Sequence, residues 1–395
     1  MLDPEARIKI RGVVHRLLFL IPQAAASVPL RSLSSGPIRS LWAGQAIHTL
    51  ASNAEAERTQ GVAADSLVYK RYATRADFTF DLTRWTRLPV LGKVLPYFVL
   101  AWSLRRYERF HFFYNRGLLA QVEPGRFNVD ELVLLRKLDK QVFFWAYGAD
   151  VRTREATLAV SAPNCCQFCP AVTELCVCDQ QTGTENYSFI RNLATGCASM
   201  GDMRWYTPGS DNSIFYWPVD LEVNDGELFA HTALEADTAG PLRLAHAPNT
   251  PELKGTQFLL DAVAALQHEG LDITLDLVRG VSNDEVMDRF RSADVIFDQC
   301  LIGFHGYTAL EAMALGRPVL CFLREPATDL VDPETCPIVN VTPATIADEL
   351  RTLYGQDERR RTLGEAGRRY VQDHHSLEAV GARIQSFIER CHEDI

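Results

Sequence analysis

The chain alternates short apolar runs with stretches in which apolar residues have helical spacing. The runs Val295–Phe297 and Val319–Phe322 are continuous, which is typical of parallel strands buried on both faces. Further strands are predicted at Ile38–Trp42, Arg109–Tyr114, Gln141–Tyr147, Leu242–Ala245 and Ile273–Val278. Strands that alternate with helices indicate an α/β fold, and the two groups of strands indicate two Rossmann-like domains.

Residues 1–36 stand apart from this pattern. Asp3 and Pro4 suit the N-cap and first position of a helix. The apolar positions of this helix share one face, and basic residues flank it: Ile10, Val13, Val14, Leu17, Leu18 and Ile21, with Arg7, Lys9, Arg11 and Arg16. Such a helix either lies on an anionic membrane surface or packs on its own protein, and we expect the second arrangement.

The segment after Val295–Phe297 predicts a loop with Gly303 and Gly306, followed by the helix Tyr307–Leu315. This helix is apolar on nearly every side, so we expect it to be buried. Glu311 would then be a carboxylate with little water around it, and such a group needs a donor partner. The partner is either a ligand hydroxyl or a neighbouring backbone or arginine group.

This segment resembles the nucleotide-sugar signature of GT-B-fold glycosyltransferases, in particular retaining glycosyltransferase family 4. The family pattern is Glu-Gly-Phe-Gly, then a helix with Glu-Ala-Met-Ala, then Gly-x-Pro-Val, and this chain matches the second half over Leu310–Val319. The resemblance implies that Glu311 binds the ribose hydroxyls. The family's first Glu, which contacts the donor sugar, falls on Gly303, and Phe304–Gly306 follow it.

The resemblance implies an α/β GT-B architecture, with two Rossmann-like domains facing across a cleft. The second domain would bind a nucleotide diphosphate sugar and the first a small-molecule, glycan or lipid-linked acceptor. The reaction would be glycosyl transfer with retention, without a catalytic metal. The candidate donor-binding residues are His246, Asn249, Lys254, Gly303, Gly306, Tyr307, Thr308 and Glu311.

Lys254 lies near the start of the helix that follows the strand Leu242–Ala245. The helix macrodipole disfavours a cation there, and a pyrophosphate bridging Lys254 and the helix amides would remove the conflict. The alternative is a solvated lysine on the loop. The family has Arg-x-x-x-x-Lys here, but its Arg falls on Asn249, and we expect His246 to take over part of its role.

Polar residues of the first domain follow the strand Gln141–Tyr147. Here Gly148-Ala-Asp150-Val-Arg152 resembles the family's Gly-Ser-Asp-Val-Arg, with Tyr147 in place of a preceding His. Groups just past the carboxyl end of a parallel strand lie where open α/β sheets bind ligands. Asp150 and Arg152 either contact the acceptor or cap the next helix and pair together. The acceptor-side candidates are Gly44, Tyr147, Asp150 and Arg152.

Four residues are candidates for catalysis: Lys254, Glu311, His305 and Asp150. Lys254 and the amides around Gly306–Thr308 would stabilise the charge that develops on the departing diphosphate. His305 or Asp150 would serve as a base if the chain were instead an inverting transferase or a nucleotide-sugar epimerase. The other alternative is a non-catalytic scaffold, suggested by Gly303 and Asn249.

Five cysteines fall within Cys165–Cys178. Thiolates are soft ligands, and four of them in a tetrahedron select zinc or iron–sulfur chemistry. We predict a closed, structural zinc site formed by Cys166, Cys169, Cys176 and Cys178. An iron–sulfur cluster and unliganded thiols are the alternatives.

Composition adds three points to these predictions. The 395 residues are 47% hydrophobic, enough to bury the cores of two domains. The formal net charge of −10 argues against a nucleic-acid partner. The N-terminus makes a poor signal peptide, so we expect a cytoplasmic location, with peripheral membrane association as an alternative.

The predicted organisation has five parts. Residues 1–36 form an extension, 37–221 the acceptor domain with a Cys-rich insertion near 164–179, 222–241 a linker, 242–372 the nucleotide-sugar domain, and 373–395 a helix returning toward the first domain. Within the acceptor domain, Val90–Leu104 is either a core helix or a hydrophobic wall for the acceptor.

Overall fold

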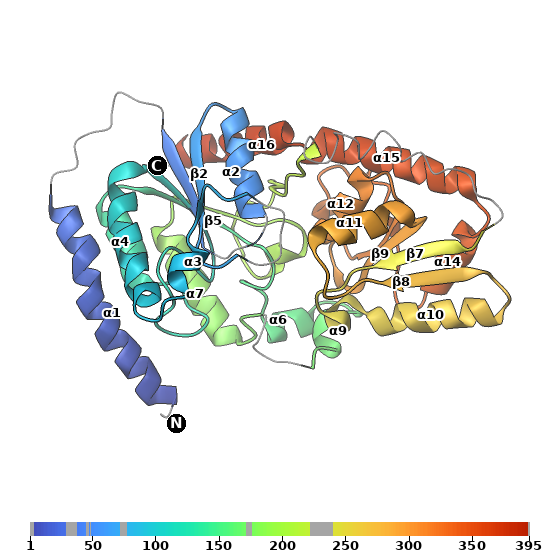
Figure 1. The fold of residues 1–395 in the computed structure, drawn as a ribbon, viewed down its shortest axis with the longest axis horizontal. Helices are drawn as coiled ribbons and strands as arrows, with labels where there is room; N and C mark the ends of the chain where they lie inside the picture. Colours follow the sequence, from blue (N-terminus) through green and yellow to red (C-terminus); the bar gives the residue numbers. More distant parts are fainter. Residues whose placement is uncertain are drawn as a thin grey trace. The chain divides into compact units, whose positions relative to one another are not determined.

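The computed structural model describes residues 4–28, 38–44, 47, 49–71, 77–170, 176–221 and 240–393. It divides into two compact units, each with a parallel sheet flanked by helices (Figure 1). Unit 1 comprises residues 1–153, 175–214 and 381–395, and unit 2 comprises residues 154–174 and 215–380. The predicted α/β class with two Rossmann-like domains is confirmed.

Unit 1 has a six-stranded parallel sheet in the order β3-β2-β1-β4-β5-β6. Its strands are β1 (Arg39–Ala43), β2 (Ala63–Val68), β3 (Phe80–Asp81), β4 (Arg109–Phe113), β5 (Gln141–Trp145) and β6 (Gly196–Ala198). Its helices are α1 (Pro4–Ser27), α2 (Thr49–Thr59), α3 (Thr83–Thr86), α4 (Leu91–Arg106), α5 (Val129–Lys137) and α7 (Gln180–Leu193), with a 3₁₀ turn at Gly201–Trp205.

Unit 2 has a five-stranded parallel sheet in the order β11-β10-β9-β7-β8. Its strands are β7 (Leu242–His246), β8 (Ile273–Leu277), β9 (Val295–Gly303), β10 (Val319–Leu323) and β11 (Val339–Asn340). Its helices are α6 (Arg154–Ala159), α9 (Pro251–Lys254), α10 (Thr256–His268), α11 (Asn283–Ser292), α12 (Tyr307–Ala314), α13 (Pro326–Asp329), α14 (Ile346–Leu353) and α15 (Asp357–His375), with a 3₁₀ turn at Cys165–Gln167. Helix α16 (Leu377–Glu393) begins in unit 2 and continues in unit 1.

All seven predicted strands are present, and the described residues contain four others that the sequence did not predict. Strand β2 contains Asp65 and Ser66, so it has no continuous apolar run, and β3, β6 and β11 are only two or three residues long. Strand β9 is longer than predicted and continues to Gly303. Among the described residues, no helix is long and apolar enough to cross a membrane.

A buried carboxylate anchors α2 to the sheet of unit 1. Glu57 accepts hydrogen bonds from Trp42 Nε1 at 2.7 Å, from Arg109 Nη1 at 3.2 Å and from the hydroxyl of Ser40. Burial raises the pKa of Glu57, but His111 and Arg109 outweigh it and lower the pKa to about 2. The ionised Glu57 therefore ties α2 to β1 and β4.

Helix α1 begins at Pro4 and packs on its own protein, but through a face that we did not predict. His15 contacts the Tyr97 hydroxyl at 2.9 Å and Asp130 Oδ2 at 2.8 Å. Phe19 and Pro22 are buried beside it. The face that we expected to be covered is largely exposed at Ile10, Val13, Val14 and Leu17. Helix α1 thus packs through the face that carries His15, Phe19 and Pro22.

The Cys-rich segment is not an insertion of the first domain. Residues 154–174 cluster with unit 2, whereas residues 175–214 cluster with unit 1. Cys165 and Cys166 belong to the core of unit 2. Nearly all of the predicted linker 222–241 lies outside the described residues.

Candidate functional site

The order in which successive strands are added to the sheet of unit 2 reverses between β7 and β9. These strands are neighbours, while β8 lies on one side of the pair and β10 and β11 on the other. In an open α/β sheet, ligands bind outside the carboxyl ends of the strands at such a switch point. His246 ends β7, and the loop that leaves β9 leads into α12.

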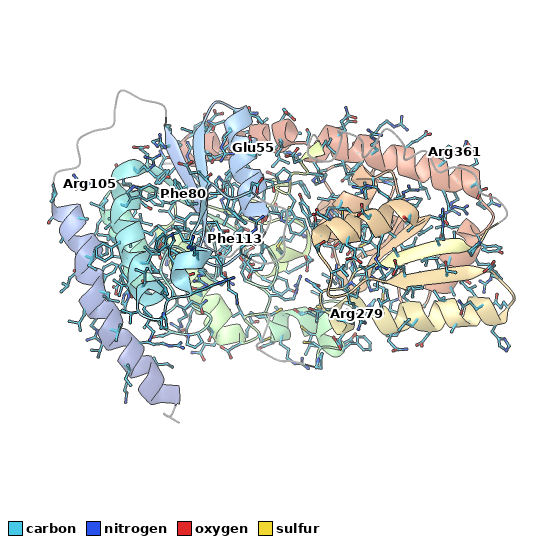
Figure 2. The ribbon with its side chains drawn as sticks, in the orientation of Figure 1. Glu55, Phe80, Arg105, Phe113, Arg279 and Arg361 are labelled. Carbon is cyan, nitrogen blue, oxygen red and sulfur yellow. The ribbon has the colours of Figure 1, made fainter. Side chains whose placement is uncertain are left out.

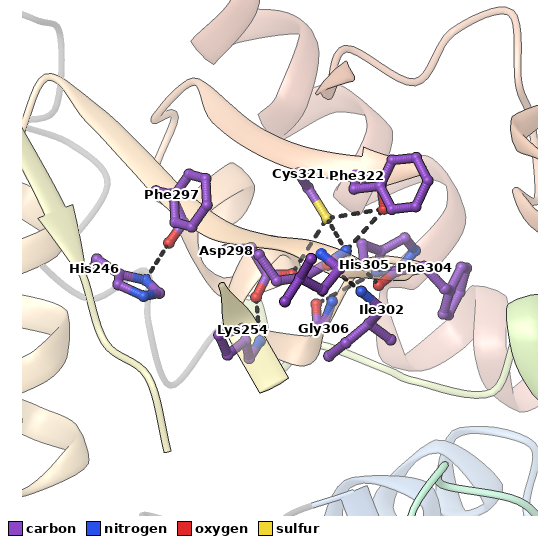
Figure 3. Close-up of polar contacts among 12 residues, drawn as sticks. His246, Lys254, Phe297, Asp298, Ile302, Phe304, His305, Gly306, Cys321 and Phe322 are labelled. Carbon is purple, nitrogen blue, oxygen red and sulfur yellow. Dashed lines mark hydrogen bonds and ion pairs between the residues drawn. The ribbon is translucent and has the colours of Figure 1, made fainter. Parts of the chain in front are cut away.

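Lys254 and Asp298 form a buried ion pair at this edge (Figure 3). Lys254 is the last residue of α9 and only 9% exposed, which excludes a solvated lysine. Its ammonium donates to one oxygen of Asp298, and the backbone N–H of Gly306 donates to the other at 2.5 Å. Burial raises the pKa of Asp298, but the Lys254 ammonium and these hydrogen bonds outweigh it and hold the pKa below its usual range.

The ion pair lies next to Gly306, the residue that precedes α12. A Cβ atom at Gly306 would lie 3.0 Å from Lys254 Nζ and 3.1 Å from Asp298 Oδ1. The absence of a side chain therefore lets the backbone that opens α12 lie directly against the ammonium. The unsatisfied amides of a helix N-terminus and a lysine together favour an anion.

His246 is buried and held at both ring nitrogens. Nδ1 donates to the Phe297 carbonyl at 2.8 Å, which leaves Nε2 to accept from the Thr256 hydroxyl at 2.9 Å. Burial lowers the pKa of His246 to about 4, so the ring is neutral near pH 7. It supplies no positive charge in place of the family's Arg, contrary to our expectation. Asn249, at the position of that Arg, is exposed.

Gly303, where the family has Glu, has a backbone conformation that L side chains rarely adopt, and Arg324 lies beside it. Gly303 has a φ of +100°, and a Cβ there would lie 2.9 Å from Arg324 Nε. Arg324 donates to the Pro163 carbonyl at 3.0 Å and to the Ile302 carbonyl at 3.3 Å. Its guanidinium thus holds the segment that includes Pro163 and occupies the space where a side chain at Gly303 would begin. The sequence did not single out Arg324.

Glu311 is less buried than we predicted. The fully buried side of α12 carries Ala309, Leu310, Ala312, Met313 and Ala314. Tyr307, Thr308 and Glu311 are only partly buried, and positions four residues apart lie on the same side of a helix. Glu311 Oε1 accepts a hydrogen bond from Asn283 Nδ2 at 3.3 Å. A partly open carboxylate on this side of α12 is accessible to a ligand hydroxyl.

His305 is more buried than the partly open side of α12 that carries Glu311. It is buried, with its ring centroid 4.1 Å from that of Phe304 and 6.1 Å from that of His375. Tyr307 donates its hydroxyl to the Pro218 carbonyl at 2.6 Å. His305 and Gly306 belong to the loop between β9 and α12, and Lys254 lies against that loop at Gly306.

Asp298 and Gln299 are residues that our reading of the sequence missed. Gln299 Oε1 accepts from the N–H groups of Leu301 and Ile302 at 2.7 and 2.6 Å, and Nε2 donates to the Phe322 carbonyl at 2.8 Å. These bonds replace strand pairing where the register between β9 and β10 shifts. An acid and an amide inside an otherwise apolar strand were the available signal.

The candidates in unit 1 lie after its own parallel strands. Asp150 accepts from the N–H groups of Tyr147 and Gly148 at 2.9 and 3.0 Å, and burial raises its pKa to about 7. Arg152 forms an ion pair with Asp202 at 2.7 Å.

Gly44 follows β1, at the switch point between β1 and β4. It has a φ of +124°, and a Cβ there would lie 2.4 Å from the Arg116 carbonyl oxygen. Glycine is therefore required at Gly44 by packing and backbone conformation.

The four predicted zinc ligands fall in different units. Cys166 and Cys169 belong to unit 2, and Cys176 and Cys178 to unit 1. Over the described part of the chain, no group of three or more His, Cys, Asp or Glu residues is arranged to hold a metal ion. Zinc at these four cysteines therefore stays a prediction.

No protein-family model matches the sequence, and no curated protein matches it. Solved structures do match. Sucrose-phosphate synthase from Thermosynechococcus elongatus is 15% identical, with 91% of this chain and 97% of that chain covered and a TM-score of 0.56. Anabaena Alr3699/HepE in complex with UDP is 12% identical, with 90% and 100% covered and a TM-score of 0.56. A glycosyltransferase from Rickettsia africae ESF-5 is 10% identical, with 91% and 99% covered and a TM-score of 0.55.

These likenesses extend over nearly the whole chain and show that it has the GT-B fold that we predicted. At such identities they show the fold alone. Membership of glycosyltransferase family 4 stays a prediction.

Replacement of Lys254 by Met should destabilise unit 2 by about 3–5 kcal/mol, because it leaves the Asp298 carboxylate buried without a counter-charge. The double variant Lys254→Met, Asp298→Asn should recover most of this loss. The measurement is the free energy of unfolding in urea, with the exposed Lys93→Met as the control. If Lys254→Met unfolds like the unmodified protein, Lys254 does not neutralise Asp298.

Proposed function

We propose that the chain is a glycosyltransferase that binds a nucleotide diphosphate sugar at the carboxyl ends of β7 and β9. The observation that carries this proposal is the position of Lys254, buried at the switch point of the sheet and against the first residues of α12. A buried lysine next to helix amides favours a diphosphate. The GT-B fold supports the proposal, since Alr3699/HepE was crystallised with UDP and with UDP-glucose.

Lys254 and the α12 amides would act mainly as the sugar departs. The bond between the sugar and the diphosphate breaks, and negative charge grows on the phosphate oxygen. An ammonium has three donors, so Lys254 can keep its bond to Asp298 and still donate to phosphate. Groups fixed before the reaction stabilise that charge without reorganisation. Asp298 fixes the lysine, and Gly306 gives its backbone access.

Glu311 would bind the nucleotide ribose. Its carboxylate lies on the partly open side of α12, and Asn283 holds one of its oxygens. We propose retention of anomeric configuration on the resemblance to family 4. Unit 1 would bind the small-molecule, glycan or lipid-linked acceptor, with Gly44, Tyr147, Asp150 and Arg152 as its candidates.

A screen of nucleotide sugars tests this function. With acceptor present, a transferase releases the nucleoside diphosphate in proportion to glycosylated product. An epimerase would give a new nucleotide sugar without that release, and a scaffold would bind nucleotide without changing it. Because Lys254→Met alone should destabilise unit 2, the role of the lysine in turnover is measured in the double variant with Asp298→Asn.

Replacement of Glu311 by Gln should weaken UDP binding by about 1.5–3 kcal/mol, the scale of a hydrogen bond to a charged group. This corresponds to roughly ten- to hundredfold in Kd. Isothermal calorimetry with UDP gives the value. Glu252→Gln, an exposed acid on α9, is the matched control and should bind as the unmodified protein does. If Glu311→Gln binds UDP with the same Kd as Glu252→Gln, Glu311 does not bind the ribose.

We also keep the proposal of one structural zinc at Cys166, Cys169, Cys176 and Cys178. A closed thiolate site contributes folding energy, so its loss should lower the melting temperature without changing the chemistry of transfer. Elemental analysis of the purified protein should give about one zinc per chain. A value far below this, with all five thiols of the segment titratable, would leave unliganded cysteines.

A further inference from the structure

One side of α1 exposes a continuous line of large apolar residues. Its members are Ile10, Val13, Val14, Leu17 and Leu20, which we call the α1 stripe, and they are 42–65% exposed. Their spacing of three and four residues places them on one side of the helix. Single exposed apolar residues are common, but a continuous line of five marks a binding surface.

The contacts of α1 leave this stripe uncovered by unit 1. His15, Phe19 and Pro22 occupy the other side, and His15 is bonded to Tyr97 of α4 and to Asp130. Arg105 Nη1 of α4 also donates to the Ala25 carbonyl at 3.4 Å, and Figure 2 labels Arg105 near the end of α1. The helix is thus held in place with the stripe facing outward.

A second group of exposed apolar residues lies at the start of α4. Because His15 contacts Tyr97 and Ala25 contacts Arg105, α1 and α4 run in the same direction (Figure 1). The first turns of α1 therefore lie toward the turn between α3 and α4. Helix α3 exposes Trp85, and the turn after it exposes Leu88 and Val90.

Both segments are basic in an acidic chain. Residues 1–28 contain four basic and two acidic residues, and residues 83–106 contain five basic residues and no acidic one. The whole chain has a formal net charge of −10. On α1, Lys9, Arg11 and Arg16 are exposed beside the stripe. Exposed apolar residues between cations favour a surface that is apolar inside and anionic outside.

We propose that the α1 stripe docks on the surface of a bilayer that contains anionic lipids. Its apolar side chains enter the boundary between headgroups and acyl chains, and Lys9, Arg11 and Arg16 contact the lipid phosphates. A second copy of the chain fits this surface less well, because the basic residues beside the two stripes would repel each other. The docking does not depend on the glycosyltransferase proposal, since it uses no residue of the unit 2 site.

Co-sedimentation of the full chain with vesicles tests the docking. One set of vesicles is pure phosphatidylcholine, and the other contains phosphatidylglycerol as the anionic lipid. The unmodified chain should bind the anionic vesicles, and Val13→Glu, Leu17→Glu should lower its partition coefficient by about tenfold or more. Arg11→Glu, Arg16→Glu should lower it similarly and remove its dependence on salt.

The matched control carries the same added charge elsewhere. Leu158→Glu, Leu260→Glu changes two exposed leucines of unit 2 and should bind like the unmodified chain. Circular dichroism establishes that each variant is folded. No binding to anionic vesicles, or equal binding by Val13→Glu, Leu17→Glu, overturns the proposal. So does a dimer in light scattering that this variant abolishes while vesicle binding is absent, because the stripe would then be a contact between copies.

Discussion

The ion pair between Lys254 and Asp298 determines how the edge of the sheet in unit 2 is built. Asp298 lies inside a buried strand, where a lone carboxylate would be strongly unfavourable. The ammonium of Lys254 and the N–H of Gly306 satisfy its two oxygens. One carboxylate therefore fixes α9, β9 and the start of α12 together. The candidate phosphate site lies where these three elements meet.

Unit 1 uses a buried carboxylate in a related way. Glu57 on α2 pairs with Arg109 of β4 and binds Trp42 of β1. In unit 1 the acid is on the helix and the cation on the sheet, whereas in unit 2 the acid is on the sheet and the cation on a helix. In both units the pair joins elements next to the switch point of the sheet. In unit 1, however, Arg109 is the first residue of β4, so its pair lies toward the amino ends of the strands and away from the ends where open α/β sheets bind ligands.

The surface of unit 1 differs in charge from the chain as a whole. The chain is acidic as a whole, yet α1 and the segment from α3 through α4 are basic and expose apolar side chains. Net charge describes solubility and long-range attraction, but local charge decides which surface a partner approaches. The proposed chemistry at the strand ends of unit 2 and the proposed docking through α1 therefore use separate parts of one chain.

The sequence alone determined the α/β class, seven strands and the glycine loop before α12, because these features follow from local apolar periodicity and from the backbone freedom of glycine. It also identified Lys254 and Glu311 as candidates. Only the tertiary structure decided what surrounds them. Lys254 and Asp298 are 44 residues apart, and strand order brings them together.

The same reason explains the other differences between prediction and structure. The assignment of residues 154–174 to unit 2, the space that Arg324 takes beside Gly303, and the outward side of α1 all depend on contacts between distant segments. Periodicity shows that a residue has an apolar side to bury, but not which distant group will cover it. Tertiary packing made that choice because a buried charge or a buried histidine must find a partner, wherever in the chain that partner lies.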